Sequence, residues 1–212
     1  MRKTLTPLTL EELRELHSTQ RAAIQQRLRE FSNVPPSEYF YELVYCLLTP
    51  QSSAINADKA VHLLREHNLL NVDINPELFL HQKDFYIRFH KTKAKHLVNI
   101  KKEFPLIAQH LVNGSPSVEL REWLVKNVKG LGWKEASHFL RNIGHRNLAI
   151  LDRHVLKNLV RLGVIRRLPK TLTPKRYKSI EKKFQKFSKS IDIPMDELDL
   201  LFWSMETGEI LK

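Results

Sequence analysis

Residues 128–136 read Val-Lys-Gly-Leu-Gly-Trp-Lys-Glu-Ala, and this stretch decides the fold. The sequence around it predicts one helix that ends near Val128 and a second that begins near Trp133. Gly130 and Gly132 lack a Cβ, so both tolerate a positive φ and a closely approaching backbone. The first N–H groups of the second helix have no intrahelical partner, which suits an anion such as a DNA phosphate. The stretch is typical of a helix–hairpin–helix motif, although a plain tight connection between two helices would also contain G-x-G.

The remainder of the chain predicts helices and no convincing strand. Glycine occurs only six times in 212 residues, and three of the six lie within 130–144. Elsewhere apolar residues recur at helical spacing after polar N-cap residues, as in 9–31 and 173–190. A helix is also predicted for 92–103, where Pro105 either kinks it or starts a new segment. We therefore predict an all-α fold of nine to eleven helices, arranged as two helical lobes with a DNA-binding cleft between them.

The charge of the chain points to a polyanionic partner. It carries 35 Lys and Arg against 23 Asp and Glu, a formal net charge of +12 at pH 7. Nucleic acid is the commonest partner of such an excess, whereas the alternative is a basic surface adapted to solubility or heat. No apolar run reaches ~18 residues and the start of the chain lacks a signal sequence, so we expect an intracellular protein with no membrane span. The single cysteine, Cys46, excludes an internal disulfide and a four-cysteine zinc or iron–sulfur site.

Two residues near the hairpin are candidates for chemistry. Lys134 stands in the first turn of the second hairpin helix, and Asp152 follows the apolar run 148–151 at the start of another predicted helix. Taken separately, Lys134 reads as a solvated helix residue and Asp152 as an ordinary N-cap. Taken together, the two could flank a bound nucleotide from two sides.

The segments 130–134 and 151–154, Gly-Leu-Gly-Trp-Lys and Leu-Asp-Arg-His, resemble the helix–hairpin–helix-GPD superfamily of base-excision DNA glycosylases. More narrowly, residues 129–142 are similar to the second, mostly archaeal and thermophile family of 8-oxoguanine DNA glycosylase/AP lyases. The resemblance runs from about Glu42 to the last residue. Further segments that agree are 48–54, Arg88-Phe89-His90 with Lys93-Ala94, and 207–212.

The resemblance implies a mechanism. The damaged nucleotide is flipped out of the duplex, and the hairpin lysine, Lys134, attacks its C1′ to form a Schiff base. β-Elimination then cuts the strand 3′ to the abasic site. The family aspartate maps onto Asp152, which would assist deprotonation of Lys134 and stabilise positive charge on the sugar. Lys129 precedes the turn, so we expect it to contact phosphate at most.

The resemblance also implies how the base is bound. The flipped base would lie between the rings of Phe89 and Trp203, the terminal carboxylate of Lys212 would help to read it, and Gln51 would fill the gap it leaves. The alternatives are that both rings belong to the core, that Lys212 is a frayed tail, and that Gln51 is a polar group at a helix N-terminus. The other expected DNA contacts are Gly130, Gly132, Arg153 and His154.

We expect no metal site, because the ten histidines show no convincing ligand spacing for zinc. No redox or organic cofactor is implied. The resemblance allows a monovalent cation at the hairpin carbonyls. We predict a monomeric glycosylase unit over 1–212 that acts on double-stranded DNA containing 8-oxoguanine or abasic sites. One lobe would span about 35–150, including the hairpin, and the other about 1–34 plus 151–212. The competing hypotheses are a glycosylase for another damaged base, a non-catalytic DNA-binding hairpin module, and a basic protein with no nucleic-acid role.

Overall fold

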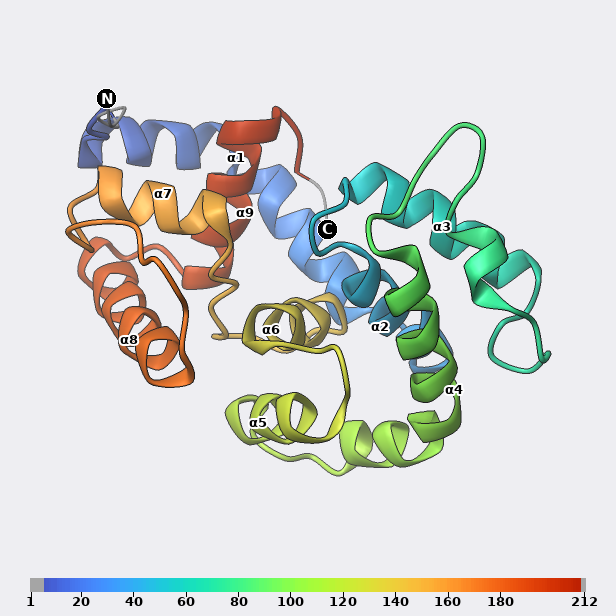
Figure 1. Cartoon of the computed structure of the whole chain (residues 1–212). Coiled ribbons are helices and arrows are strands. Elements are labelled where there is room, and N and C mark those ends of the chain that lie inside the picture. The colour runs from blue at the N-terminus through green and yellow to red at the C-terminus, as the bar shows by residue number, and fades with distance from the viewer. Residues whose placement is uncertain (1–5, 211–212) are drawn as a thin grey trace. The chain divides into compact units, whose positions relative to one another are not determined.

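The predicted all-α fold is confirmed in the computed structural model, which describes residues 6–210 of the chain (Figure 1). Within that range the only extended pairing is an isolated bridge between His81 and Tyr86. The α-helices are α1 (Leu10–Ser32), α2 (Tyr39–Leu48), α3 (Ala54–Glu66), α4 (His90–Val112), α5 (Ser117–Asn127), α6 (Trp133–Asn142), α7 (Arg153–Arg161), α8 (Pro174–Ile191) and α9 (Met195–Thr207), and two 3-10 helices span Pro36–Glu38 and Pro76–Phe79. None of the helices in residues 6–210 is long and apolar enough to cross a bilayer.

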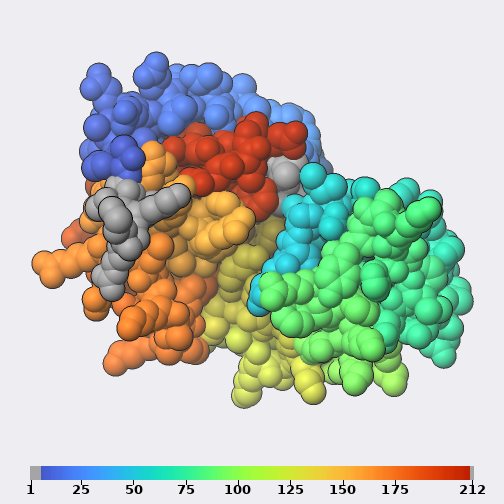
Figure 2. Space-filling view, turned by 45° about the horizontal axis from the view of Figure 1, so that its top comes forward, coloured from blue at the N-terminus to red at the C-terminus, as the bar shows by residue number. Residues whose placement is uncertain are grey.

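The chain forms two compact units, and the first is discontinuous in sequence. It combines the chain up to Asn33 with the chain from Gly144 onward. Its centre is α9, which packs against α1, α7 and α8 and buries Leu198, Leu201 and Phe202 (Figures 1 and 2). α9 is also tied to α1 by polar contacts, because the buried Glu197 lies 2.5 Å from the His17 ring and accepts a hydrogen bond from Gln25.

The second unit spans Val34–Ile143 and is built around α2. Nine of the ten residues of α2 are buried, because α3, α4 and α6 surround it. α4 continues through Pro105 instead of starting a new segment there. Pro105 itself is exposed, and the flanking Ile100 and Ile107 are buried, so packing on both sides holds the helix together.

The segment 144–150 groups with the first unit, whereas the sequence analysis assigned it to the lobe that holds the hairpin. Backbone hydrogen bonds explain the difference. The Asn147 N–H donates to both carboxylate oxygens of Asp196 at the start of α9, at 3.2 and 3.1 Å. The Ala149 N–H donates to Glu181 of α8 at 2.9 Å.

Candidate active site

The hairpin between α5 and α6 has the predicted turn. Gly130 adopts φ +92°, a conformation that favours glycine. A Cβ at Gly130 would lie 2.2 Å from Nδ1 of His96, so the site also lacks room for a side chain. Leu131 is buried, and its N–H donates to the Val128 carbonyl at 3.2 Å. The buried Leu131 side chain and this hydrogen bond therefore hold the turn against its own unit.

Gly132 differs from the expectation. It has φ −86°, which any residue can adopt, and a Cβ there would meet only the flexible carboxylate of Glu135, at 2.8 Å. Gly132 therefore does not use the freedom of φ that glycine allows, because it has the extended backbone of a helix N-cap. It offers no side-chain acceptor to the first N–H groups of α6. An anion can therefore bind there without displacing a cap.

Lys134 is the second residue of α6. Its side chain is 25% exposed, and its Nζ lies 3.8 Å from the Glu135 carboxylate. The buried Arg121 of α5 holds the turn that carries Lys134 in place. The Arg121 guanidinium stacks on the Trp133 ring, 4.9 Å from its centroid, and donates to Ser137 at 3.2 Å. The Lys134 side chain is therefore partly accessible to solvent, while contacts of Arg121 hold the backbone that carries it.

A second lysine in this unit, Lys93, received no role from the sequence. It is buried, and its ammonium donates to the carbonyls of Leu48 and Pro50, at 2.6 and 2.7 Å, and to Ser52 Oγ at 3.3 Å. Burial, followed by the positive charge of Lys134, lowers the pKa of Lys93 to about 8. The only sequence signal was its place in the segment after Phe89 that resembled the glycosylase family.

The Lys93 contacts hold the loop after α2 close to the start of α4, and each of these two segments has a residue with an unusual backbone conformation. Gln51 and Phe89 adopt φ +57° and +59°, and Ser52 links them because its Oγ accepts a hydrogen bond from the Arg88 N–H at 3.0 Å. The Phe89 ring is 51% exposed beneath the Arg88 guanidinium, so its assignment to the core is wrong. Gln51 is not a helix N-terminal residue either, since Ser53 caps α3. Non-glycine residues with a left-handed backbone conformation are enriched at functional sites.

In the first unit, the Asp152 carboxylate has three donors among residues 6–210. Its Oδ1 accepts the N–H groups of His154 and Val155, both at 2.8 Å, and this confirms the N-cap interpretation. Its Oδ2 accepts the indole N–H of Trp203 at 2.8 Å. A carboxylate has about four acceptor sites, so one site on Oδ2 is left for a further partner. The edge of the His154 ring packs against the Trp203 ring, which is only partly buried.

α8 fixes the segment that leads to Asp152. The buried Tyr177 hydroxyl donates to the Ala149 carbonyl at 2.5 Å and accepts the Leu151 N–H at 3.2 Å. Glu181 accepts the N–H of Ala149. The backbone before the N-cap therefore has its polar groups satisfied by one helix face, and Asp152 cannot shift without breaking these bonds.

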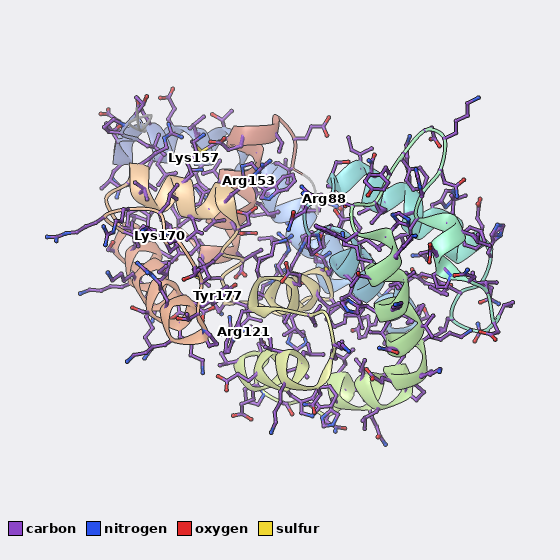
Figure 3. The ribbon with its side chains drawn as sticks, in the orientation of Figure 1. Arg88, Arg121, Arg153, Lys157, Lys170 and Tyr177 are labelled. Carbon is purple, nitrogen blue, oxygen red and sulfur yellow. The ribbon has the colours of Figure 1, made fainter. Side chains whose placement is uncertain are left out.

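Two basic residues, Arg153 and Lys157, follow Asp152 on α7. Figure 3 shows Arg153 and Lys157 on this helix. The exposed Arg153 donates through Nε to the His154 ring at 3.1 Å. Lys157 pairs with both oxygens of Glu206, at 2.7 Å each. Arg153 has no carboxylate partner among the residues that the structure describes, so its charge is available to a phosphate.

Comparison with known proteins identifies the family. Residues 24–193 match the family model for 8-oxoguanine DNA glycosylase. The chain belongs to the 8-oxoguanine DNA glycosylase family. It is 44% identical over 213 residues to an 8-oxoguanine DNA glycosylase/AP lyase of Fusobacterium nucleatum subsp. nucleatum, covering 95% of this chain and 96% of that protein. A protein of the same name from Korarchaeum cryptofilum is 39% identical, with 91% of each chain covered.

Solved structures of family members have the same fold. The Methanocaldococcus jannaschii 8-oxoguanine glycosylase/lyase, in complex with 15mer DNA containing 8-oxoguanine, gives a TM-score of 0.85 at 31% identity, with 96% of this chain and 99% of that one covered. The 8-oxoguanine DNA glycosylase of Thermotoga maritima gives 0.84 at 32% identity, with 96% and 98% covered.

In this chain the predicted site residues fall into two groups, one in each unit. The structure joins Asp152, His154 and Trp203 by direct contacts in the first unit, and links Gln51 to Phe89 through Ser52 in the second. Lys212 lies outside the described residues. Among residues 6–210, no three His, Cys, Asp or Glu side chains are grouped so that they could hold a metal ion. The second-unit group comprises Gln51, Phe89, Gly130, Gly132 and Lys134, and the first-unit group comprises Asp152, Arg153, His154 and Trp203.

Proposed function

We propose that this chain is an 8-oxoguanine DNA glycosylase/AP lyase that excises the damaged base from double-stranded DNA and then cleaves the strand. The observation that carries the proposal is the family match, because residues 24–193 include both the hairpin lysine and the aspartate. The named activity of the relatives and a solved relative's complex with 8-oxoguanine DNA support it.

Lys134 is the proposed nucleophile. Its amine attacks C1′ of the flipped nucleotide, and the bond from C1′ to the base breaks, so that the base leaves with the electron pair and takes up a proton. Opening of the sugar ring gives a Schiff base between Lys134 and C1′. Loss of a proton from C2′ then expels the 3′ phosphate oxygen, which is β-elimination. The partial exposure of Lys134 allows this approach.

Asp152 is the proposed partner of that reaction. Its Oδ1 is occupied by the α7 cap, while Oδ2 accepts one indole N–H and keeps a free acceptor site. That site can receive the proton of the attacking amine or face the positive charge that develops on the sugar. The same carboxylate can therefore serve both as helix cap and as catalyst.

Base binding is assigned to exposed or partly exposed groups. The Phe89 and Trp203 rings offer faces for stacking, which is worth about 1–3 kcal/mol per base. The Gln51 side chain is exposed and its backbone has a left-handed conformation, which suits a residue that fills the gap in the duplex. Gly130, Gly132, Arg153 and His154 are the proposed phosphate contacts.

The proposed chemistry uses an amine and a carboxylate, and we propose that it needs no metal or organic cofactor. A monovalent cation at the hairpin carbonyls remains a prediction. We further propose that the enzyme acts as a monomer, inside the cell where its DNA lies.

The test is borohydride trapping on a duplex with one 8-oxoguanine, beside the undamaged duplex. Wild type and the Lys129→Gln variant should form a covalent adduct with the damaged duplex only, while Lys134→Gln should form none and still bind DNA. Lys129 is the matched control because it is an exposed lysine of the same hairpin, before the turn.

Other outcomes would decide between alternatives. An adduct with Lys134→Gln but none with Lys129→Gln would move the nucleophile to Lys129. Trapping by wild type on a different damaged base only would change the substrate. Binding without any adduct would leave a non-catalytic DNA-binding module.

A further inference from the structure

Most of the net charge of the chain is concentrated in one segment. Residues 166–189 contain ten Lys or Arg and one Glu, a net charge of +9 out of +12 for the whole chain. This segment comprises the loop before α8 and nearly all of α8, in the first unit. It contains neither the hairpin nor any of the proposed catalytic residues.

α8 has two chemically distinct faces. One face is buried and apolar, with Tyr177, Ile180 and Phe184 in the core. Cations line the opposite face, where Lys175, Lys182 and Lys189 recur at intervals of seven residues. At 1.5 Å per residue, the 18 residues of α8 present this face over about 27 Å.

Nine of the ten cations form no ion pair within residues 6–210. Glu181, the only acid in the segment, is buried and accepts the N–H of Ala149. The segment has nine exposed cations, none of which forms an ion pair with any residue that the structure describes: Arg166, Arg167, Lys170, Lys175, Arg176, Lys182, Lys183, Lys186 and Lys189. Figure 2 shows part of this segment, in orange, projecting from the surface. Nine unpaired charges on one surface repel one another, and a polyanion would relieve that repulsion.

We propose that the basic face formed by residues 166–189 binds backbone phosphates of duplex DNA, independently of sequence and of the lesion. The inference rests on the proposed function, which makes duplex DNA the partner. The first unit would thus have a DNA-binding surface of its own, in addition to the hairpin in the second unit. Such phosphate contacts increase the affinity for undamaged DNA, along which the enzyme searches for its substrate.

The chemistry of the segment favours duplex phosphates over other polyanions. A helix that inserts into a membrane surface needs an exposed apolar face, whereas the apolar face of α8 is the core of its unit. A single-stranded nucleic acid needs exposed aromatic rings for stacking, whereas Tyr177 and Phe184 are buried and Phe187 is only partly exposed. Apart from one large exposed apolar side chain, Leu168, the segment offers mainly positive charge, and a double-helical backbone requires such charge.

The position of α8 connects this surface to the chemistry. Its buried Tyr177 and Glu181 hold the backbone of Ala149 and Leu151, directly before Asp152. Phosphates bound on the outer face of α8 are therefore separated by the width of this helix from the segment that positions the Asp152 carboxylate. A duplex held on α8 fixes the register of the DNA relative to this unit.

The test compares two double variants of equal charge. Lys182→Gln with Lys186→Gln removes two charges from the proposed face. Lys83→Gln with Lys102→Gln removes two exposed lysines from the second unit that have no ion-pair partner among residues 6–210. Affinity for an undamaged 30-base-pair duplex is measured from 50 to 200 mM salt. Each lost phosphate contact should reduce the slope of log K against log salt by about 0.9, which is about a threefold change in affinity over this range.

We expect a reduced slope for the α8 variant only, and the wild-type slope for the variant that lacks Lys83 and Lys102. Equal slopes for wild type and the α8 variant would overturn the inference while leaving the proposed function intact. Binding of wild type, but not of the α8 variant, to anionic lipid vesicles, with unchanged DNA slopes, would replace DNA by a membrane surface. A wild-type protein that neither traps nor excises 8-oxoguanine would instead refute the proposed function.

Discussion

The carboxylate of Asp152 serves two neighbours at once, since Oδ1 caps α7 and Oδ2 accepts the Trp203 indole N–H. The Asp152→Asn side chain has one oxygen and one NH2 group. If the oxygen continues to cap α7, the NH2 group faces the indole N–H of Trp203, so two donors oppose each other and that hydrogen bond is lost. We expect the free energy of unfolding to fall by about 1.5–3 kcal/mol, the range for a hydrogen bond to a charged group. We also expect single-turnover excision to fall more than tenfold. Denaturant unfolding and quenched-flow kinetics measure the two effects.

Trp203→Phe is the matched control, because it removes the indole donor and keeps both an aromatic ring and the Asp152 charge. We expect a similar loss of stability and a smaller loss of excision. Equal losses of excision in both variants would assign the effect to the hydrogen bond and not to the charge. A wild-type rate in Asp152→Asn would remove Asp152 from the mechanism.

Lys93 should make stability depend on pH. Its pKa in the folded protein is lowered to about 8, mainly by burial, whereas a free lysine titrates near 10.4. Between these values the unfolded chain binds more protons than the folded one, so the free energy of unfolding contributed by Lys93 rises with pH. Lys93→Met should lack this rise when urea unfolding is compared at pH 7, 8.5 and 10. The exposed Lys95→Met on the same helix should retain it, and parallel profiles for wild type and Lys93→Met would contradict the assignment.

These two residues also show what a sequence reveals at this scale. The cap made by Asp152 was predictable because its partners lie two and three residues away. The role of Lys93 was not, since its carbonyl partners lie 45 and 43 residues away and lysine is rarely buried. The link from Trp203 to Asp152 spans 51 residues and was hidden for the same reason.

At the scale of elements, the hairpin offers a matched pair of glycine substitutions. Gly130→Ala would impose φ +92° on an L-residue and place a Cβ 2.2 Å from the His96 ring. We expect it to lower the free energy of unfolding by more than about 1 kcal/mol and to weaken DNA binding. Gly132→Ala should be tolerated, because its φ is ordinary and only the mobile Glu135 carboxylate must move. Thermal unfolding and affinity for duplex DNA, measured for both variants, would show the difference between them. Equal effects of the two substitutions would contradict this account of the turn.

Helix boundaries were predictable where local chemistry sets them. Thr9 caps α1 with a full capping box, Thr173 and Pro174 start α8, and Gly208 ends α9 at φ +83°. Pro105 left two expectations open, a kink or a new segment, and the continuous α4 contradicts the second because the effect of this proline is not local. The apolar residues of α4 on both sides of it pack into the second unit, and this burial outweighs the lost hydrogen bond.

At the scale of the whole molecule, the first unit needs both ends of the chain. α1 packs on α9 and buries Leu13, Ile24 and Phe31, and the Leu8 N–H donates to the Arg161 carbonyl at the end of α7. The group of residues around Asp152 therefore depends on a helix more than a hundred positions earlier. No local pattern encodes that pairing, which is why the first thirty-five residues carried little information about the site.

Two isoleucines test whether the units respond separately, because Ile24 of α1 and Ile100 of α4 are both fully buried. Each change to alanine should lower the free energy of unfolding by about 2–5 kcal/mol through the cavity it leaves. Ile24→Ala should speed amide hydrogen exchange in α7 and α9, around Asp152 and Trp203, and leave α2 and α6 protected. Ile100→Ala should do the reverse and loosen the first turn of α6, which carries Lys134. Faster exchange throughout both units in either variant would mean that the chain unfolds as one cooperative body, and that the two groups of site residues cannot be perturbed independently.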